Sequence, residues 1–183
     1  MKLTTKQIAT TALLLAICIM SQFFKNLNVY ITGPVINAAL ILAVLYCGLG
    51  CGIILAVITP VTAFLITGSP VMSAIPAIIP CIIAGNIILV LAVSRFQKLV
   101  KKPYGFPIGI IVGAVLKAAF MGAVISYWIL PAYLPDKMQK MLPALQTQFS
   151  VTQLLTALIG GAYAFIIAIA LKSAFGVNGT QEV

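Results

Sequence analysis

The segment 107–130 constrains the fold of this chain most strongly, because it is long enough to cross a lipid bilayer and carries one charge, Lys117, near its middle. About 15 Å of helix separates Pro107 from this lysine, so the ammonium group does not easily reach the nearer headgroups. A charge at that depth costs about 2.5–3.5 kcal/mol on insertion scales. Lys117 is therefore predicted to face protein or a water-filled cavity. It serves either a ligand or ion site, or a structural role in capping exposed carbonyls.

The rest of the chain repeats the apolar character of this segment. Of its 183 residues, 62% are hydrophobic and only 7% are charged, which is far outside the balance of a soluble domain. We expect an all-α integral membrane protein with six transmembrane helices, folded as a single domain over residues 1–183. The predicted spans are 8–24, 34–47, 52–67, 73–93, 107–130 and 151–171.

The basic residues give this bundle an orientation. The net charge of +9 is concentrated in one set of loops, which is typical of the positive-inside rule rather than of nucleic-acid binding. Both termini and the loop 95–102 are therefore predicted to be cytoplasmic. The cytoplasmic set is Lys2, Lys6, Arg95, Lys98, Lys101, Lys102 and Lys172, and the external set is Lys25, Lys137 and Lys140.

Several kinds of chemistry are excluded by what the sequence lacks. The only acidic residues, Asp136 and Glu182, lie in a loop and in the tail, there is no histidine, and the four cysteines have no metal-ligand spacing. Carboxylate-driven ion coupling, two-carboxylate hydrolysis and an ordinary zinc site are thus not expected. We predict no catalytic residue, no metal and no cofactor. No small-x-small cleavage pattern follows Met20, so the first span is expected to be a mature helix.

The first external loop is predicted to form the wall or lid of a site. The pair Gly33-Pro34 is typical of a helix breaker, which leaves a second helix of about fourteen residues, near 20 Å, between Pro34 and the glycines at 48, 50 and 52. Because that helix is shorter than a bilayer core, the loop 25–33 should dip inward over a site that opens to the outside. Asn37 would point into the same space, or would make an interhelical hydrogen bond.

Three polar residues of spans four, five and six are predicted to share one layer of the bundle. Asn86, Lys117 and Tyr163 lie twelve or thirteen residues inside their external helix ends, or about 18–20 Å deep on straight helices. The missing countercharge for Lys117 is then an anionic ligand, freed carbonyls, water or a neutral lysine. Above this layer Trp128, Tyr30, Gln153 and Asn37 are candidates to hold a small, flat, polar molecule, although Trp128 and Tyr30 also fit an interfacial aromatic belt.

Small residues mark two helix-packing faces. Gly105, Gly109 and Gly113 recur at intervals of four before Lys117, which allows a neighbouring helix to approach closely. Ala9, Ala12 and Ala16 form a similar stripe on the first span, which either packs within the bundle or docks a partner subunit. The segment 131–150 mixes charged and apolar residues, as in a short helix on the outer face or a plain loop.

The six spans, the cytoplasmic termini, the dipping first loop and the pair Ala12 and Ala16 together resemble the S component, the substrate-binding subunit, of an energy-coupling factor (ECF) transporter. In that family an Ala-x-x-x-Ala pattern on the first helix contacts a transmembrane coupling subunit. Members that carry nickel or cobalt use an amino-terminal histidine, which this chain lacks.

The resemblance implies a prokaryotic plasma-membrane subunit that binds a water-soluble vitamin or vitamin precursor and works with a coupling subunit and two cytoplasmic ATPases. A thiamine-related thiazole or pyrimidine precursor is the first candidate, followed by pantothenate, niacin or a B6 vitamer. The chain has no G-x-x-x-x-G-K-[ST] loop for ATP, which agrees with dependence on partners. The rival interpretation is a small structural or assembly membrane protein without a transported ligand.

Overall fold

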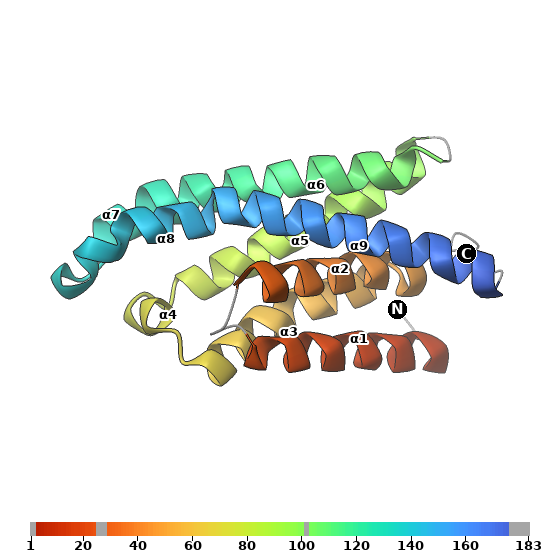
Figure 1. Cartoon of the computed structure of the whole chain (residues 1–183), viewed down its shortest axis with the longest axis horizontal. Coiled ribbons are helices and arrows are strands. Elements are labelled where there is room, and N and C mark those ends of the chain that lie inside the picture. Colours follow the sequence, from red (N-terminus) through yellow and green to blue (C-terminus); the bar gives the residue numbers. More distant parts are fainter. Residues whose placement is uncertain (1–2, 25–28, 101–102, 176–183) are drawn as a thin grey trace.

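A computed structural model describes residues 3–24, 29–100 and 103–175 of the chain. These residues contain helices and no strand, and the helices lie side by side in an elongated bundle (Figure 1). Six helical segments are long and apolar enough to span a membrane. The predicted fold class and number of spans are thus confirmed. The helices are α1 (Thr5–Phe23), α2 (Val29–Cys47), α3 (Leu49–Thr67), α4 (Pro70–Ala74), α5 (Ile78–Leu99), α6 (Gly105–Met121), the π-helix η1 (Gly122–Ile129), α7 (Leu130–Tyr133), the 3₁₀ helix η2 (Asp136–Met141), α8 (Leu142–Phe149) and α9 (Val151–Phe175).

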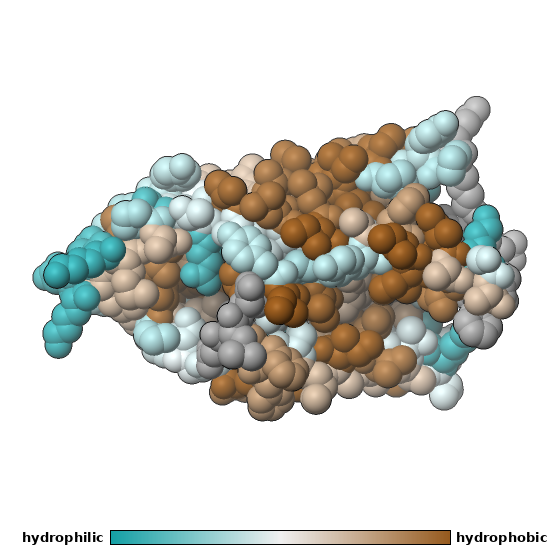
Figure 2. Space-filling view, in the orientation of Figure 1, coloured by the Kyte–Doolittle hydropathy of each residue, from teal (hydrophilic) through white to brown (hydrophobic). Residues whose placement is uncertain are grey.

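The two ends of the bundle differ in what they carry. In Figure 1 the start of α1, the end of α9 and the α5–α6 connection lie at one end, and α4, α7 and α8 lie at the other. Figure 2 shows hydrophobic side chains over the middle of the molecule and the most hydrophilic ones toward the α7 end. Lys6, Arg95 and Lys172 thus belong to the end with the termini, and Lys137 belongs to the opposite end. This separation is the one that the charge distribution predicts for a membrane-spanning bundle.

The second helix differs from its prediction. It begins at Val29 and holds Pro34 in its interior, so it has 19 residues rather than about fourteen. A helix of that length is about 28 Å long and needs no dipping loop to complete the span. The predicted loop 25–33 is therefore wrong for residues 29–33, which are helical, while residues 25–28 lie outside the described part of the chain.

Packing against α9 explains why Gly33-Pro34 does not break this helix. A Cβ on Gly33 would lie 2.8 Å from Thr156 Cγ2, so α2 and α9 are in close contact at the proline. Pro34 lies only in the second turn of α2, where its missing N–H removes one intrahelical hydrogen bond. The contacts that α2 gains along α9 outweigh that loss.

The fourth span is also different, because it is divided. Residues 70–74 form the short α4, and α5 begins only at Ile78, so the predicted continuous helix 73–93 is interrupted around Pro76. Proline restricts the residue before it to extended conformations, and Ile75 has φ −131° and ψ 81°. Pro80 lies in the first turn of α5, where it is tolerated. Because of this break, Met72 belongs to the short α4, which lies at the end of the bundle opposite the termini.

The fifth and sixth spans extend beyond the bundle as a helical hairpin. Helices α6, η1 and α7 form one continuous helical segment, Gly105–Tyr133, of 29 residues. The chain returns through η2 and α8, so segment 131–150 is helical rather than a plain loop. Ser126 Oγ donates to the Gln146 carbonyl at 2.9 Å, and Gln146 Nε2 donates to the Ser126 carbonyl at 3.0 Å. This reciprocal pair joins η1 to α8.

The bundle core is divided into two apolar clusters. One includes Leu40, Leu55 and Leu89 in the half nearer the termini, and the other includes Met72, Met121 and Phe149 toward the α7 end. The glycines of α6 pack against α5 as predicted, since a Cβ on Gly109 would lie 3.0 Å from Val93 Cα. Polar side chains lie between the two clusters, and they form the site described below.

Candidate functional site

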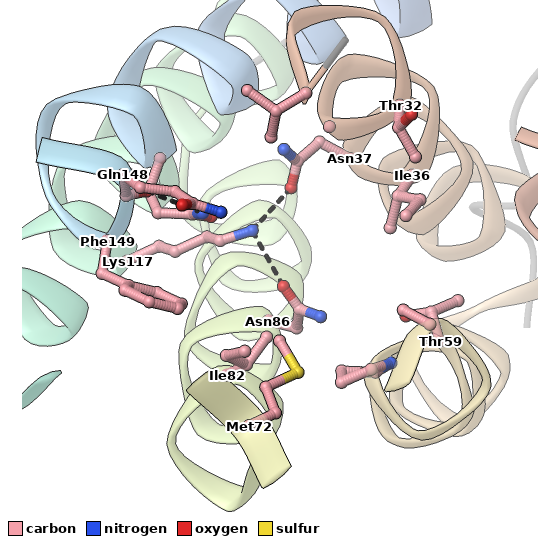
Figure 3. Close-up of a pocket in the computed structure, with 15 residues that line it drawn as sticks. Thr32, Ile36, Asn37, Thr59, Met72, Ile82, Asn86, Lys117, Gln148 and Phe149 are labelled. Carbon is pink, nitrogen blue, oxygen red and sulfur yellow. Dashed lines mark hydrogen bonds between the residues drawn. The ribbon is translucent and has the colours of Figure 1, made fainter. Parts of the chain in front are cut away.

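Lys117 is buried in the bundle and holds three helices together. Its side chain is 3% exposed, and its Nζ donates to Asn37 Oδ1 at 2.7 Å and to Asn86 Oδ1 at 2.8 Å. The three residues come from α6, α2 and α5, which meet around the ammonium group (Figure 3). Both asparagines are also buried, with exposed fractions of 2% and 3%. The lysine thus faces protein, as its depth in span five required.

Glycines allow the helices to come this close. A Cβ on Gly160 of α9 would lie 2.7 Å from Asn37 Cβ, so α9 presses directly on the helix that carries this asparagine. On the other side, a Cβ on Gly85 would lie 3.6 Å from Lys117 Cγ and 2.8 Å from Met121. A larger residue at either position would displace a member of the cluster.

A cavity of about 100 Å³ adjoins this cluster. Its wall is mostly apolar, with polar groups on the side where Lys117, Asn37 and Asn86 meet (Figure 3). Val29, Thr32 and Gly33 belong to the wall, so the residues before Pro34 line the site although they are helical. The full lining is Val29, Thr32, Gly33, Ile36, Asn37, Thr59, Pro60, Ala63, Met72, Ile82, Asn86, Lys117, Gln148, Phe149 and Gln153.

At the Lys117 end of this cavity the polar groups that remain are mainly hydrogen-bond donors. An ammonium group has three N–H donors, and the structure gives two of them an acceptor. Because both asparagines turn Oδ1 toward the lysine, their Nδ2 groups remain as donors, and neither has a hydrogen bond to another described residue. Gln153 Nε2 donates to the Gln148 carbonyl at 3.3 Å, which leaves Gln153 Oε1 as an acceptor. Convergent polar groups at the wall of a mostly apolar cavity are the usual form of a small-molecule binding site.

Four of the seven residues predicted to bind a substrate lie together at this cavity. They are Asn37, Asn86, Lys117 and Gln153. The other three, Tyr30, Trp128 and Tyr163, are not among the lining residues and have exposed fractions of 49%, 67% and 47%. A role for them in binding stays a prediction that this geometry does not support.

The predicted polar layer therefore has a different third member. Asn37 joins Lys117 and Asn86, and Tyr163 does not, because α9 turns Ala157, Gly160 and Ala164 toward the bundle and leaves Tyr163 on the outer side. Trp128 follows Lys117 by eleven residues, which is about three turns of a regular α-helix and would put both side chains on one face. The wider π-helix η1 separates the two residues and changes that register.

Several wall residues are not among the predicted ones, including Thr59, Met72, Gln148 and Phe149. Gln148 and Phe149 end α8, where a polar segment reads as solvated surface, and Met72 belongs to the separate α4. The sequence does contain one signal for Thr59, which is a threonine directly before a proline within an apolar span. Gln22 Nε2 donates to the Thr59 carbonyl at 3.1 Å, so this part of the wall is tied to α1.

The alanine stripe of α1 lies on the outside of the molecule. Ala9, Ala12 and Ala16 are exposed, whereas Thr11, Leu14 and Cys18 on the opposite face are buried against the bundle. Of the two roles predicted for the stripe, packing within its own bundle is therefore wrong. The exposed face remains available to lipid or to another protein.

Comparison with known proteins places these observations in context. A family model described as "ECF transporter, substrate-specific component" matches residues 6–172, which is nearly the whole chain. No curated protein and no solved structure matched the chain. The match begins in the first turn of α1 and ends in the last turn of α9. It therefore covers nearly all of the six candidate membrane spans.

Proposed function

We propose, from the premise that this chain belongs to the family of substrate-specific components of ECF transporters, that it captures a water-soluble vitamin or vitamin precursor in the cavity beside Lys117. Its family makes it a substrate-binding transport subunit and a multi-pass membrane protein. The candidates are the thiazole and pyrimidine precursors of thiamine, pantothenate, niacin and B6 vitamers. The site would load from outside the plasma membrane of a prokaryote.

The observation that carries this proposal is the hydrogen-bonded cluster of Lys117, Asn37 and Asn86 at the wall of a cavity. Ionisable residues inside a membrane are costly, and they usually mark the path or the site of a substrate. Gln148 and Gln153 add further polar groups to the same wall, and Phe149 adds an aromatic face. A mostly apolar pocket with a few convergent polar groups is the usual form of a small-molecule site.

The chain needs partners to release what it binds into the cell. It has no phosphate-binding loop for ATP, so ATP hydrolysis is not built into it. Of its two acidic residues, Asp136 is exposed in η2 and Glu182 is the second-last residue of the sequence, so we expect no carboxylate-based ion coupling within the bundle. A transmembrane coupling subunit and two cytoplasmic ATPases would supply the energy. We propose that the coupling subunit docks on the exposed face of α1 that carries Ala9, Ala12 and Ala16.

The binding proposal is tested with the full chain purified in detergent. Small molecules retained through purification are identified by mass spectrometry, and binding is then measured by calorimetry across a panel of the vitamins and precursors named above. We expect one member to bind in the micromolar range or tighter. Absence of both a retained molecule and any binding in the panel would refute the proposal in favour of a structural role.

The docking proposal is tested by enlarging the stripe. Ala12→Trp and Ala16→Trp should abolish co-purification with the coupling subunit, because an indole prevents close helix approach, and should leave ligand binding intact. Ile166→Trp, which places an indole at an exposed position of α9 away from the stripe, is the matched control. Normal assembly of both alanine variants would show that the coupling subunit docks elsewhere.

A further inference from the structure

We propose that the ligand of this cavity is a small carboxylate, bound with its negative charge at Lys117 and with a compact, largely apolar remainder against the opposite wall. The inference rests on the proposed function and narrows its substrate class. It favours the acidic candidates over the neutral and cationic ones. Three properties of the site support it: an unneutralised cation, an excess of donors and a small volume.

The first property is the missing countercharge. Lys117 is 3% exposed and its two partners are neutral amides, which share its protons without neutralising it. The only carboxylate side chain in the described part of the chain, Asp136, lies exposed in η2, and Glu182 falls in the tail. Among the residues that the structure describes, no side-chain anion thus lies beside the lysine. A buried charge without a counterion is strongly unfavourable, and an anionic ligand would supply the counterion.

The second property is the polarity of the hydrogen-bonding groups. The lysine occupies the Oδ1 acceptors of Asn37 and Asn86, so the groups left at this end of the site are its own third N–H and the two Nδ2 amides. A carboxylate has two oxygens that accept several hydrogen bonds, and it has no N–H or O–H to donate. It therefore complements a set of free N–H donors. A cationic or donor-rich ligand would face donors with donors.

The third property is size. The cavity of about 100 Å³ is well below the range of about 300–1,000 Å³ that is usual for drug-sized ligands. Its apolar wall includes Ile36, Pro60, Met72, Ile82 and Phe149. These side chains suit a single ring or a short branched chain. Figure 3 shows Phe149 beside the Lys117 stem and Ile36 on the other side of the hydrogen-bonded cluster.

Pairs of compounds that differ only in the charged group test the inference directly. Nicotinate and nicotinamide share one ring, and pantothenate and panthenol share one chain, so each pair compares a carboxylate with a neutral substituent. We expect the purified chain to bind the acid of at least one pair about 30-fold or more tightly than its neutral partner, as measured by calorimetry, because the neutral partner leaves the buried charge unpaired. Equal binding of both members would overturn the inference and leave the proposed function intact.

A variant shows where that preference arises. Lys117→Met should bring the acid and its neutral partner to within about 3-fold of each other, since it removes the one charged residue among the lining residues, whereas the loss of the two asparagine hydrogen bonds affects both compounds alike. Lys172→Met, an exposed lysine at the end of α9, is the matched control and should keep the wild-type preference. If Lys117→Met folds and still prefers the acid, the anion binds elsewhere and the inference is wrong.

The molecule retained by the purified protein decides the case in which neither pair binds. A retained carboxylic acid supports the inference, and a retained neutral or cationic compound overturns it without affecting the proposed function. If no compound is retained and none binds, both the inference and the proposed function fail.

Discussion

The contact between Gly160 and α2 gives the sharpest test of how the site is held together. In Gly160→Ala, the new Cβ would lie 2.5 Å from the Pro34 carbonyl oxygen, 2.7 Å from Asn37 Cβ and 3.0 Å from the Ala38 nitrogen. Ordinary contact begins at about 3.4 Å, and two of these neighbours are backbone atoms that cannot rotate away, so α9 and α2 must separate by about 0.9 Å. Asn37 moves with α2.

The size of the effect follows from that displacement. If the whole shift fell along the Lys117 Nζ to Asn37 Oδ1 direction, the distance would rise from 2.7 Å to about 3.6 Å, beyond hydrogen-bond range. Losing a hydrogen bond to a charged group costs about 1.5–3 kcal/mol, and overpacking costs about 1–3 kcal/mol. The higher helix propensity of alanine offsets up to about 1 kcal/mol of this. We therefore expect a net loss of about 1.5–6 kcal/mol, or a fall of about 3–24 °C in the midpoint of thermal unfolding.

The cysteines of the chain provide the assay. Cys18, Cys47 and Cys51 are buried and free, so a thiol-reactive fluorescent dye reports their exposure as the protein unfolds in detergent. Gly122→Ala is the matched control, because its Cβ would come no closer than 3.3 Å to a flexible Ser150 side chain. An unfolding midpoint for Gly160→Ala equal to that of Gly122→Ala would refute the close backbone contact.

A double-mutant cycle separates the hydrogen bond from the packing. In a Lys117→Met background, Gly160→Ala should cost about 1.5–3 kcal/mol less than in the wild type, since the bond to Asn37 is already absent. Strictly additive effects would mean that the glycine supports helix packing and has no influence on the lysine cluster.

Three further predictions concern the site, the hairpin and the orientation. Asn86→Asp places a carboxylate beside Lys117. It should weaken binding of the proposed carboxylate ligand by about 30-fold or more without lowering the unfolding midpoint. An unchanged calorimetric affinity would contradict a negative charge on the ligand. Gln146→Ala removes a bond to Ser126 and should lower the unfolding midpoint by about 2–4 °C, and no change would mean that water replaces the amide. In intact cells a membrane-impermeant maleimide should label Lys137→Cys and spare Lys98→Cys, and the reverse labelling would invert the orientation.

The sequence was sufficient for the features that depend on depth in the membrane. Hydropathy predicts six spans because every apolar segment of this length must be buried in lipid or protein. The cost of a charge in the bilayer places Lys117 against protein for the same reason, and the described structure holds it 3% exposed. Neither prediction requires knowledge of which helices are neighbours.

The predictions were wrong where contacts between neighbouring helices determine the structure. Pro34 was a sound local signal for a helix start, yet the close approach of Thr156 at Gly33 keeps α2 helical through it. Depth along a straight helix placed Tyr163 level with Lys117, but only the packing of α9 on α2 determines which side of α9 faces inward. Counting turns failed for Trp128 because a single-sequence pattern does not show the π-helix η1.

The cost of the polar cluster connects these findings to function. Apolar side chains at positions 37, 86 and 117 would pack three helices without burying a charge, and exchange of buried ionic groups for apolar ones is often neutral or stabilising. The bundle instead holds two amide oxygens at 2.7 Å and 2.8 Å from the ammonium and leaves a cavity beside it. A purely structural brace has no need of that space or of the two Nδ2 donors that face no described partner. Both features would follow from the proposed carboxylate ligand, which would supply the missing acceptor and the countercharge of the lysine.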